Sequence, residues 1–326
     1  YTARVYTKHI VSSVQNHELV NDSTLHVVGV ISNSVRYHSR YRIFREWETF
    51  MREACNVQLH IVELAFGDRH FECVDSCPGH LQLRSSSELW LKENMINLAV
   101  RHLLPRDWRY MAWIDADVFF GNPNWALETI HELQRYPLVQ PWSECVDLGV
   151  HGNVLSLFRS FSSLAQRGVK QQAKSQDPYP YGHSGFAWAC TRLFWENIGG
   201  LMDFPILGSA DHHMAWASLG SVDESIHAKM GDTFKRLFHD WQYRAFSQTH
   251  GNLGYVPGRI EHRFHGPKKR RYYRERWQIL TQNAFDPVTD LRRDAQGLYM
   301  IVGKPQLVED IRAYMRSRHE DSIEEE

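Results

Sequence analysis

The sequence lacks several features that would decide its class at once. No apolar run approaches the roughly 20 residues that span a bilayer, and neither a Gly-x-Gly-x-x-Gly turn nor a P-loop is present. The net charge of −1 provides no overall field that would attract nucleic acid or a membrane surface. These absences argue against the common dinucleotide-binding and ATP-binding folds, and against nucleic-acid binding as the whole function.

The start of the chain shows no targeting signal. It begins at Tyr1 instead of a methionine, and no signal-like apolar region follows. We expect a trimmed start and a soluble, cytoplasmic protein. With 326 residues, 43% of them hydrophobic, the chain can bury a substantial core in one large α/β domain or in two small ones.

The cysteines are odd in number and show no disulfide framework: Cys55, Cys73, Cys77, Cys145 and Cys190. Two of them lie in a compact His-x2-Cys-x3-Cys-x2-His cluster formed by His70, Cys73, Cys77 and His80. Because both residue types bind zinc, a structural zinc site is one interpretation. A surface loop with incidental thiols is the interpretation that we favour.

Two aspartates interrupt an apolar segment, Arg109–Phe120, that is short enough for a buried strand. Alternate residues of an extended chain point the same way, so Asp115 and Asp117 can converge on one hard cation. Such a cation has positions left over for phosphate oxygens, and it would neutralise the charge of a diphosphate leaving group. The alternative is a polar loop after a strand, with no ligand.

Strand and helix patterns alternate along the first half of the chain, the order expected of a mostly parallel sheet flanked by helices. Ligands of such sheets gather at the carboxyl ends of the strands, where the two aspartates fall. A capping box predicts a helix that starts at Ser85, and Asn122 is predicted to cap another. The predicted strands are 25–32, 57–64, the aspartate segment and 137–140, and the predicted helices are 37–54, 85–104 and one after Asn122.

Other segments show no regular pattern. Residues 1–24 are expected to form an extended arm, and residues 67–83 a loop. Lys170–Pro180 is polar and suggests a mobile loop. Glu320–Glu326 is acidic and is predicted to be disordered.

The aspartate pair in its context resembles the Asp-x-Asp motif of GT-A nucleotide-sugar glycosyltransferases. The wider run of Glu88–Asn94, Leu104-Pro105 and Trp108–Tyr110 resembles a type common in bacteriophage genomes. The resemblance covers residues 25 to about 300. It implies a GT-A fold with a mostly parallel central sheet, a nucleotide-sugar half at 25–140 and an acceptor lobe at 141–300. Residues 301–326 would form a C-terminal helix and an acidic tail.

The resemblance also implies roles for individual residues. Asp115 and Asp117 would hold Mn²⁺ or Mg²⁺ against the donor diphosphate, with a late histidine, His262 or His265, completing the metal ligands. Lys268 would offer the diphosphate a point charge and Arg271 a two-pronged donor, although the six basic residues between 268 and 276 could instead form a solvated helix face. Further donor-binding candidates near this edge are Arg36, Asp68, Arg84 and Lys92.

An acidic residue at the head of a helix is the candidate general base. In the resembling transferases it follows a Gly-Phe-Ala segment and a Gly-Gly turn, and here it is Asp211. Its carboxylate could take the proton of an acceptor hydroxyl, or it could simply cap the helix. We expect the neighbouring His212 and His213 to serve packing or substrate contact and not to bind metal.

The function that we expect is metal-dependent transfer of a sugar, from a UDP-sugar in the first instance, to an acceptor hydroxyl. The acceptor could be 5-hydroxymethylpyrimidine in viral DNA, met by Lys268–Trp277 and the polar loop, in which case the enzyme would work in the host cytoplasm. A glycan or a small molecule is the alternative acceptor. The other candidate functions are a metal-dependent phosphohydrolase and a nucleic-acid-binding module. Whether transfer inverts or retains the anomeric centre stays open.

Overall fold

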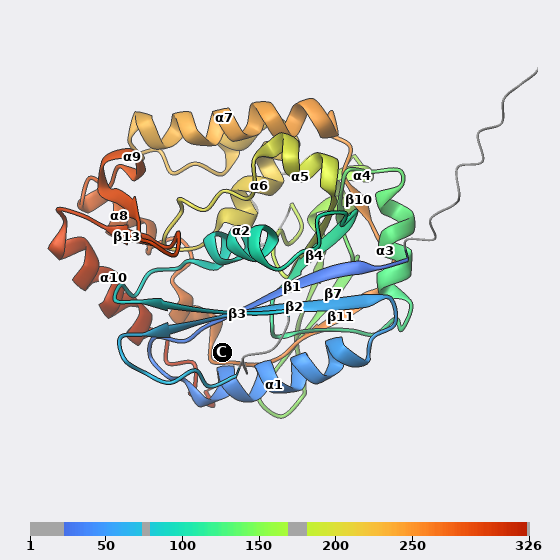
Figure 1. The fold of residues 1–326 in the computed structure, drawn as a ribbon, viewed down its shortest axis with the longest axis horizontal. Helices are drawn as coiled ribbons and strands as arrows, with labels where there is room; N and C mark the ends of the chain where they lie inside the picture. Colours follow the sequence, from blue (N-terminus) through green and yellow to red (C-terminus); the bar gives the residue numbers. More distant parts are fainter. Residues whose placement is uncertain (1–22, 74–78, 169–180, 325–326) are drawn as a thin grey trace, which may run out of the picture.

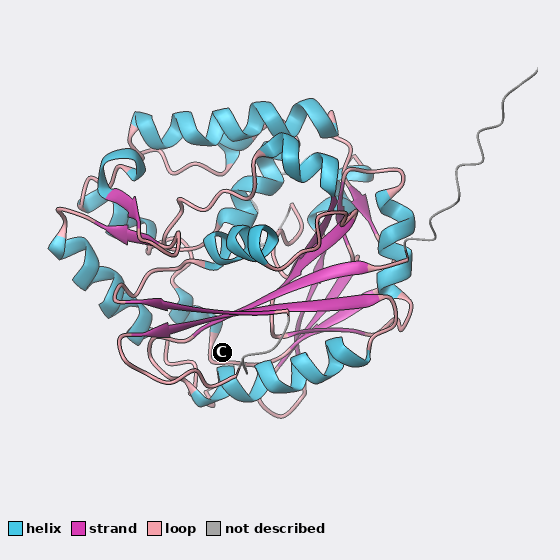
Figure 2. Ribbon diagram, viewed as in Figure 1, coloured by secondary structure: helices cyan, strands magenta, loops and turns pink. Residues whose placement is uncertain are grey.

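The structure, a computed structural model, describes residues 23–73, 79–168 and 181–324. Its centre is a seven-stranded sheet in the order β10-β6-β9-β4-β1-β2-β3 (Figures 1 and 2). Every neighbouring pair in this sheet is parallel except the two pairs made by β9. The predicted mostly parallel α/β sheet is therefore confirmed. The strands are β1 (Leu25–Ser32), β2 (Val57–Phe66), β3 (His80–Ser85), β4 (Tyr110–Ile114), β6 (Leu138–Gln140), β9 (Ala187–Thr191) and β10 (Gly254–Tyr255).

A second, four-stranded sheet has the order β5-β11-β7-β8. In it β11 runs antiparallel to β5 and parallel to β7. A separate two-stranded hairpin, β12-β13, lies near the end of the chain. The bounds are β5 (Val118–Phe120), β7 (Glu144–Leu148), β8 (Val154–Arg159), β11 (Arg259–His262), β12 (Leu291–Arg293) and β13 (Tyr299–Ile301).

Helices cover both faces of the large sheet, with α1 on one side and α2, α5, α6 and α7 on the other (Figure 1). The helices are α1 (His38–Glu53), α2 (Lys92–His102), α3 (Trp125–Leu133), α4 (Phe161–Gln166), α5 (Arg192–Ile198), α6 (Ala210–Ser218), α7 (Asp232–Thr249), α8 (Trp277–Gln282), α9 (Pro287–Asp290) and α10 (Pro305–Ser317), with 3₁₀ turns η1 (Val222–Glu224) and η2 (Lys268–Arg271).

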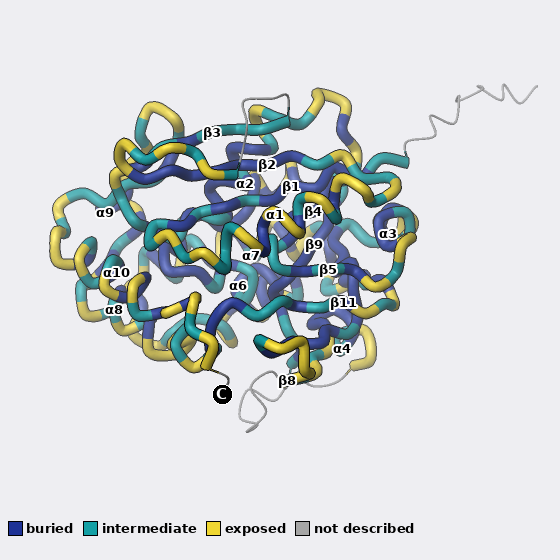
Figure 3. The backbone as a smooth tube through the Cα atoms, turned by 90° about the horizontal axis from the view of Figure 1, so that it is seen from below, coloured by how far each residue is buried: buried dark blue, intermediate teal, exposed yellow. Residues whose placement is uncertain are grey.

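The central strands are buried on both faces, as the dark tube of β1, β2 and β4 shows in Figure 3. Side chains alternate between two cores because successive strand residues point to opposite faces. Val27 packs into the core under α1 and α3, which contains Trp47. Val28 packs into the core under α2 and α5 to α7, which contains Met95.

Three local predictions need correction. The segment 67–83 was expected to be a loop, but its end begins β3, which pairs with β2. The capping box at Ser85 does not start a helix, because its hydroxyl binds the backbone of Ser87 and α2 begins only at Lys92. The residue at the cap position of α3 is Asn124 and not the predicted Asn122. The side chain of Asn122 instead accepts a hydrogen bond from the N–H of Asn124 at 2.9 Å.

The acidic end of the chain is ordered as far as it is described, contrary to the prediction of disorder. After α10 the chain passes the start of α1, where Asp321 accepts the N–H groups of His38 at 2.9 Å and Ser39 at 2.8 Å. Glu320 is only 2% exposed and forms an ion pair with Arg40 of α1. Acidic composition alone suggested solvation, whereas partners far away in sequence draw this carboxylate into the interior.

Some predictions lie outside the described residues: most of the 1–24 arm, all of the 170–180 loop, and Cys77 of the Cys/His cluster. In the described ranges, no helix combines the length and the hydropathy needed to cross a bilayer.

Gly29 on β1 leaves room for the indole ring of Trp47. A Cβ atom at position 29 would lie 2.3 Å from Cη2 of that ring. We expect Gly29→Ala to destabilise the fold by about 1–3 kcal/mol, the usual cost of overpacking a core. Gly258→Ala is the matched control, since its Cβ would meet only Cβ of Asn122 at 3.9 Å, an ordinary contact, and its φ lies outside the left-handed region. Urea unfolding of both variants measures the difference, and equal midpoints would contradict the packing argument.

Candidate active site

A cavity of about 1060 Å³ opens at the edge of the large sheet where the parallel strands β1 and β4 end. This is the edge at which such sheets bind ligands. The cavity is lined by the residues after β1 and β4, the start of α6, the end of β11, the segment around η2, and the C-terminal stretch near Glu320. Its volume lies at the upper end of the range for ligand pockets, so it can hold a ligand as large as a nucleotide sugar.

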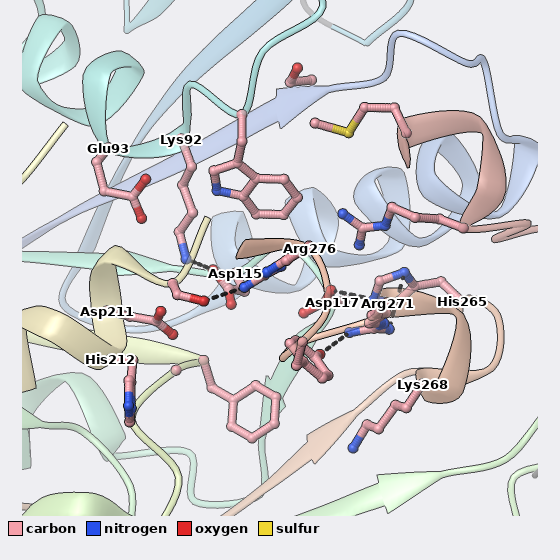
Figure 4. Close-up of a pocket in the computed structure, with 18 of the residues that line it drawn as sticks. Lys92, Glu93, Asp115, Asp117, Asp211, His212, His265, Lys268, Arg271 and Arg276 are labelled. Carbon is pink, nitrogen blue, oxygen red and sulfur yellow. Dashed lines mark hydrogen bonds and ion pairs between the residues drawn. The ribbon is translucent and has the colours of Figure 1, made fainter. Parts of the chain in front are cut away.

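Asp115 and Asp117 lie at the junction between the two sheets. β4 ends at Ile114, and the N–H of Asp115 donates to the carbonyl of Phe186 at 2.8 Å. The N–H of Val118 then donates to the carbonyl of Asp115 at 3.2 Å, which closes a tight turn, and β5 starts in the second sheet. Both carboxylates line the cavity (Figure 4), but they meet different partners.

His262 is placed by strand register. On β11 it pairs with Val118 on one side and with Asp147 of β7 on the other. Its Nδ1 lies 2.7 Å from Oδ1 of Asp147, and its Nε2 lies 3.8 Å from Oδ2 of Asp117. A buried carboxylate behind the ring therefore orients the other nitrogen toward the cavity, as is usual for histidines that bind metal.

His265 approaches Asp117 from the same side, with its Nε2 2.9 Å from Oδ2 of the carboxylate. It too has a carboxylate behind it, since its Nδ1 lies 3.4 Å from Oε2 of Glu320. Asp117, His262 and His265 each offer a ligand atom, and these atoms lie within 4.8 Å of one another. We call these three residues the DHH group.

The DHH group fits a divalent cation. The Oδ1 atom of Asp117 is buried and has no hydrogen-bond partner in the described chain, so a lone pair is left for a ligand. Burial acts to raise the pKa of Asp117, but electrostatic interaction with His262 and the hydrogen bond from His265 outweigh it and hold the pKa below its usual range. Burial also lowers the pKa of His262. An ionised carboxylate and a neutral imidazole are the forms that bind metal.

Asp115 is not in the DHH group. Its Oδ1 forms an ion pair with Nζ of Lys92, at the start of α2. Burial raises the pKa of Asp115, although Lys92 opposes this effect. Burial also raises the pKa of the neighbouring Glu93 to about 8. Of the two aspartates that the sequence predicted as metal ligands, Asp117 is thus a ligand candidate, whereas Asp115 forms an ion pair with a lysine.

The basic run 268–276 does not form a solvated helix face. Nζ of Lys268 lies 2.7 Å from Oδ2 of Asp147 and 4.3 Å from the ring centre of Phe158. Nη2 of Arg271 lies 3.0 Å from Nε2 of His265. Both predicted diphosphate contacts therefore line the cavity beside the DHH group (Figure 4).

Asp211 lies in the first turn of α6 and lines the cavity (Figure 4). The cap position of α6 is Ser209, so Asp211 is not the cap residue that the alternative interpretation required. Its Oδ2 lies close to the backbone of Gly185, where a Cβ would be only 2.7 Å away. Of the adjacent histidines, His212 lines the cavity, whereas His213 is buried and its Nδ1 lies 2.8 Å from Oγ of Ser225.

Three donor candidates do not line this cavity. Arg36 is mostly exposed and pairs with Glu72 at 3.1 Å. Asp68 is exposed. Arg84 donates to the carbonyl of Gly67 at 2.6 Å. These residues were predicted only because they lie near this edge of the sheet in sequence. Their side chains do not point into the cavity.

Several residues that shape the site were not found from the sequence. They are Arg40, Glu93, Asp147, Arg276 and Glu320. Arg276 was counted within the basic run, but nothing in the pattern marked it as buried. The others carry no local signal, because each is recruited by a strand pairing or by a contact with a distant segment.

The comparison with solved structures gives distant matches. The catalytic domain of Drosophila β1,4-galactosyltransferase 7, in complex with xylobiose, is 13% identical and covers 63% of this chain and 63% of its own, with a TM-score of 0.31. Glucosyl-3-phosphoglycerate synthase from Mycobacterium tuberculosis, in complex with Mn²⁺ and UDP, is 12% identical over 80% of this chain and 77% of its own, with a TM-score of 0.36.

A third match is 4-diphosphocytidyl-2C-methyl-D-erythritol synthase from Anaerococcus prevotii. It is 9% identical over 90% of this chain and 97% of its own, with a TM-score of 0.35. No protein-family model matches the chain, and no curated protein matches it. Because the structural likenesses are this low, the activity has to be inferred from the site itself.

The DHH group makes a prediction about metal binding. Asp117→Asn should lower Mn²⁺ affinity in the absence of any donor, because it removes the charged ligand. Asp147→Asn should lower it by roughly 10–100-fold, the usual effect of losing the carboxylate behind a histidine ligand. Asp115→Asn should change it much less, since that carboxylate faces Lys92. Calorimetric titration measures the affinities, with circular dichroism to check folding. Wild-type affinity in Asp117→Asn would refute the assignment.

Proposed function

We propose that this protein is a metal-dependent glycosyltransferase of the GT-A type, which moves a sugar from a nucleotide diphosphate, in the first instance UDP, to an acceptor hydroxyl. The observation that carries the proposal is that the DHH group and Asp211 open onto one cavity, together with Arg271 and Lys92. A metal-binding group, cations for a diphosphate and a free carboxylate are the parts that such a transfer needs.

The site residues form two groups in the cavity, one for the donor diphosphate and one for the acceptor. Asp117, His262 and His265 would hold Mn²⁺ or Mg²⁺, and two imidazoles favour the transition metal. A divalent ion there would neutralise negative charge on the diphosphate as its bond to the sugar breaks. Arg271 adds a charge-assisted donor beside it.

Asp211 acts on the acceptor. It would accept the proton of the attacking hydroxyl while the oxygen bonds to the anomeric carbon and the diphosphate leaves. A direct displacement of this kind inverts the anomeric centre. Position 185 is a glycine, and this leaves space for the Asp211 carboxylate at the cavity wall. The Cβ atom of any other residue there would occupy that space.

DNA is not the acceptor that the structure favours. The hypothesis depended on excess positive charge in the run 268–276, presented to a phosphate backbone. In the structure Lys268 pairs with Asp147, Arg270 pairs with Glu324, and Arg276 is buried. Two of these charges are therefore paired within the protein and the third is buried in the cavity wall, so an acceptor that fits inside the cavity is the better candidate.

The reaction products distinguish glycosyl transfer from phosphohydrolysis. We expect wild-type protein with Mn²⁺ and a panel of nucleotide sugars to hydrolyse one donor slowly into free sugar and nucleoside diphosphate, and excess chelator to stop it. Chromatography of the nucleotides is sufficient to measure it. Sugar 1-phosphate and nucleoside monophosphate would indicate a phosphohydrolase acting on the same metal, and no cleavage of any donor would contradict the proposal.

Asp211→Asn should lower turnover by roughly 10²–10⁴-fold, as expected for loss of a general base. Donor affinity should change little, because Asp211 lies away from the DHH group. Steady-state kinetics and UDP binding by calorimetry measure the two quantities separately. A parallel collapse of UDP binding would show that Asp211 serves the donor instead.

A further inference from the structure

Arg276 is a buried cation in the cavity wall. The residue is 6% exposed, and its guanidinium lies 5.2 Å from the ring centre of Tyr273. Its Nη1 donates to the hydroxyl of Tyr314 at 3.3 Å and its Nη2 to the hydroxyl of Ser209. These partners position the guanidinium without neutralising it. Within the described ranges, Arg276 has no carboxylate at ion-pair distance, and a buried charge of this kind is costly unless a counter-charge arrives.

The other buried or partly buried cations of the cavity wall are matched by carboxylates, except Arg271, which is assigned to the donor diphosphate above. Lys92 pairs with Asp115, and Lys268 pairs with Asp147. Arg40 and Arg318 share the carboxylate of Glu320. This contrast indicates that Arg276 is available to bind an anionic ligand.

The first turn of α6 adds to this site. Ser209, at the cap position, has φ +68° and makes no side-chain cap for the helix, while its hydroxyl accepts from Arg276. The N–H groups at the start of the nine-residue helix are thus left without a side-chain cap. Helix N-termini carry partial positive charge and bind anions, so the helix end and the guanidinium favour the same kind of ligand.

The donor does not need this charge. A nucleotide-sugar diphosphate carries two negative charges, which a divalent ion, Asp117 and Arg271 together balance. Asp211 does not balance Arg276 either, because it is not at ion-pair distance and would become neutral on taking the acceptor proton. In the close-up, Arg276 lies between Asp211 and the DHH side of the cavity (Figure 4).

We infer that Arg276 and the start of α6 form an anion-binding subsite for the acceptor, so that the acceptor of the proposed transfer carries a carboxylate or phosphate group beside its attacking hydroxyl. This inference rests on the proposed function. It makes the acceptor a small acidic molecule, and it gives Arg276 a role in choosing that molecule over neutral sugars and polyols.

Matched probes test the subsite in two ways. The first is binding without a donor: glycerol 3-phosphate against glycerol, and glucuronic acid against glucose, read as ligand-induced shifts of Tm in the presence of Mn²⁺. We expect the acidic member of at least one pair to bind 10-fold or more tightly than its neutral partner, and Arg276→Gln to abolish that preference. Arg276→Lys, which keeps the charge and loses the two-pronged geometry, should retain part of it.

The second readout separates acceptor from donor. UDP affinity with Mn²⁺, measured by calorimetry, should be nearly the same in wild type, Arg276→Gln and the control Arg236→Gln, which removes a charge from an exposed position on α7. If Arg276→Gln weakens UDP binding 10-fold or more while acidic and neutral probes bind alike, Arg276 holds the donor diphosphate and the inference is wrong. Equal binding of both members of every pair to wild type also overturns it. Absence of donor cleavage, in contrast, would count against the proposed function alone.

Discussion

The site depends on one strand pairing, that of β11 between β5 and β7. This register places His262 beside Val118, next to Asp117, and opposite Asp147 at the same time. A one-residue slip of β11 would turn the imidazole to the other face of the sheet and separate all three groups. The four-stranded sheet is small, yet it decides the geometry of the DHH group, whereas the large sheet only brings β4 to the correct edge.

A second constraint comes from the end of the chain. Glu320 is shared by Arg40 of α1, by Arg318 and by His265. Burial acts to raise the pKa of Glu320, but the charges of Arg318 and Arg40 outweigh it and keep the pKa well below normal. A buried ionic cluster is weak evidence for stability, because desolvation offsets much of the attraction. Its evident consequence is geometric: it fixes the ring of His265 from behind and ties the C-terminal segment to the start of α1.

The parts of the fold that could be predicted are those with local signals. The strand at 25–32 and the helix at 37–54 follow from hydrophobic periodicity, and the structure has them within a residue or so. The antiparallel insertion of β9 and the late start of α2 could not be predicted, because both depend on partners far away in sequence. In the site, the residue types near 115, 211 and 262–271 were predictable from pattern and resemblance. The burial of Arg276 and Glu320 was not, since composition describes a charged run as solvated.

The different environments of Asp115 and Asp117 follow from this architecture. If both belonged to one continuous strand, alternation would point them at the same partner. Instead the chain leaves the large sheet after Ile114 and enters the small sheet at Val118, so the two carboxylates meet different partners. Asp115 meets Lys92 of α2, and Asp117 meets the two histidines. The turn between two sheets therefore converts a symmetric sequence motif into an asymmetric site, with an ion pair on one side and the candidate metal-binding carboxylate on the other.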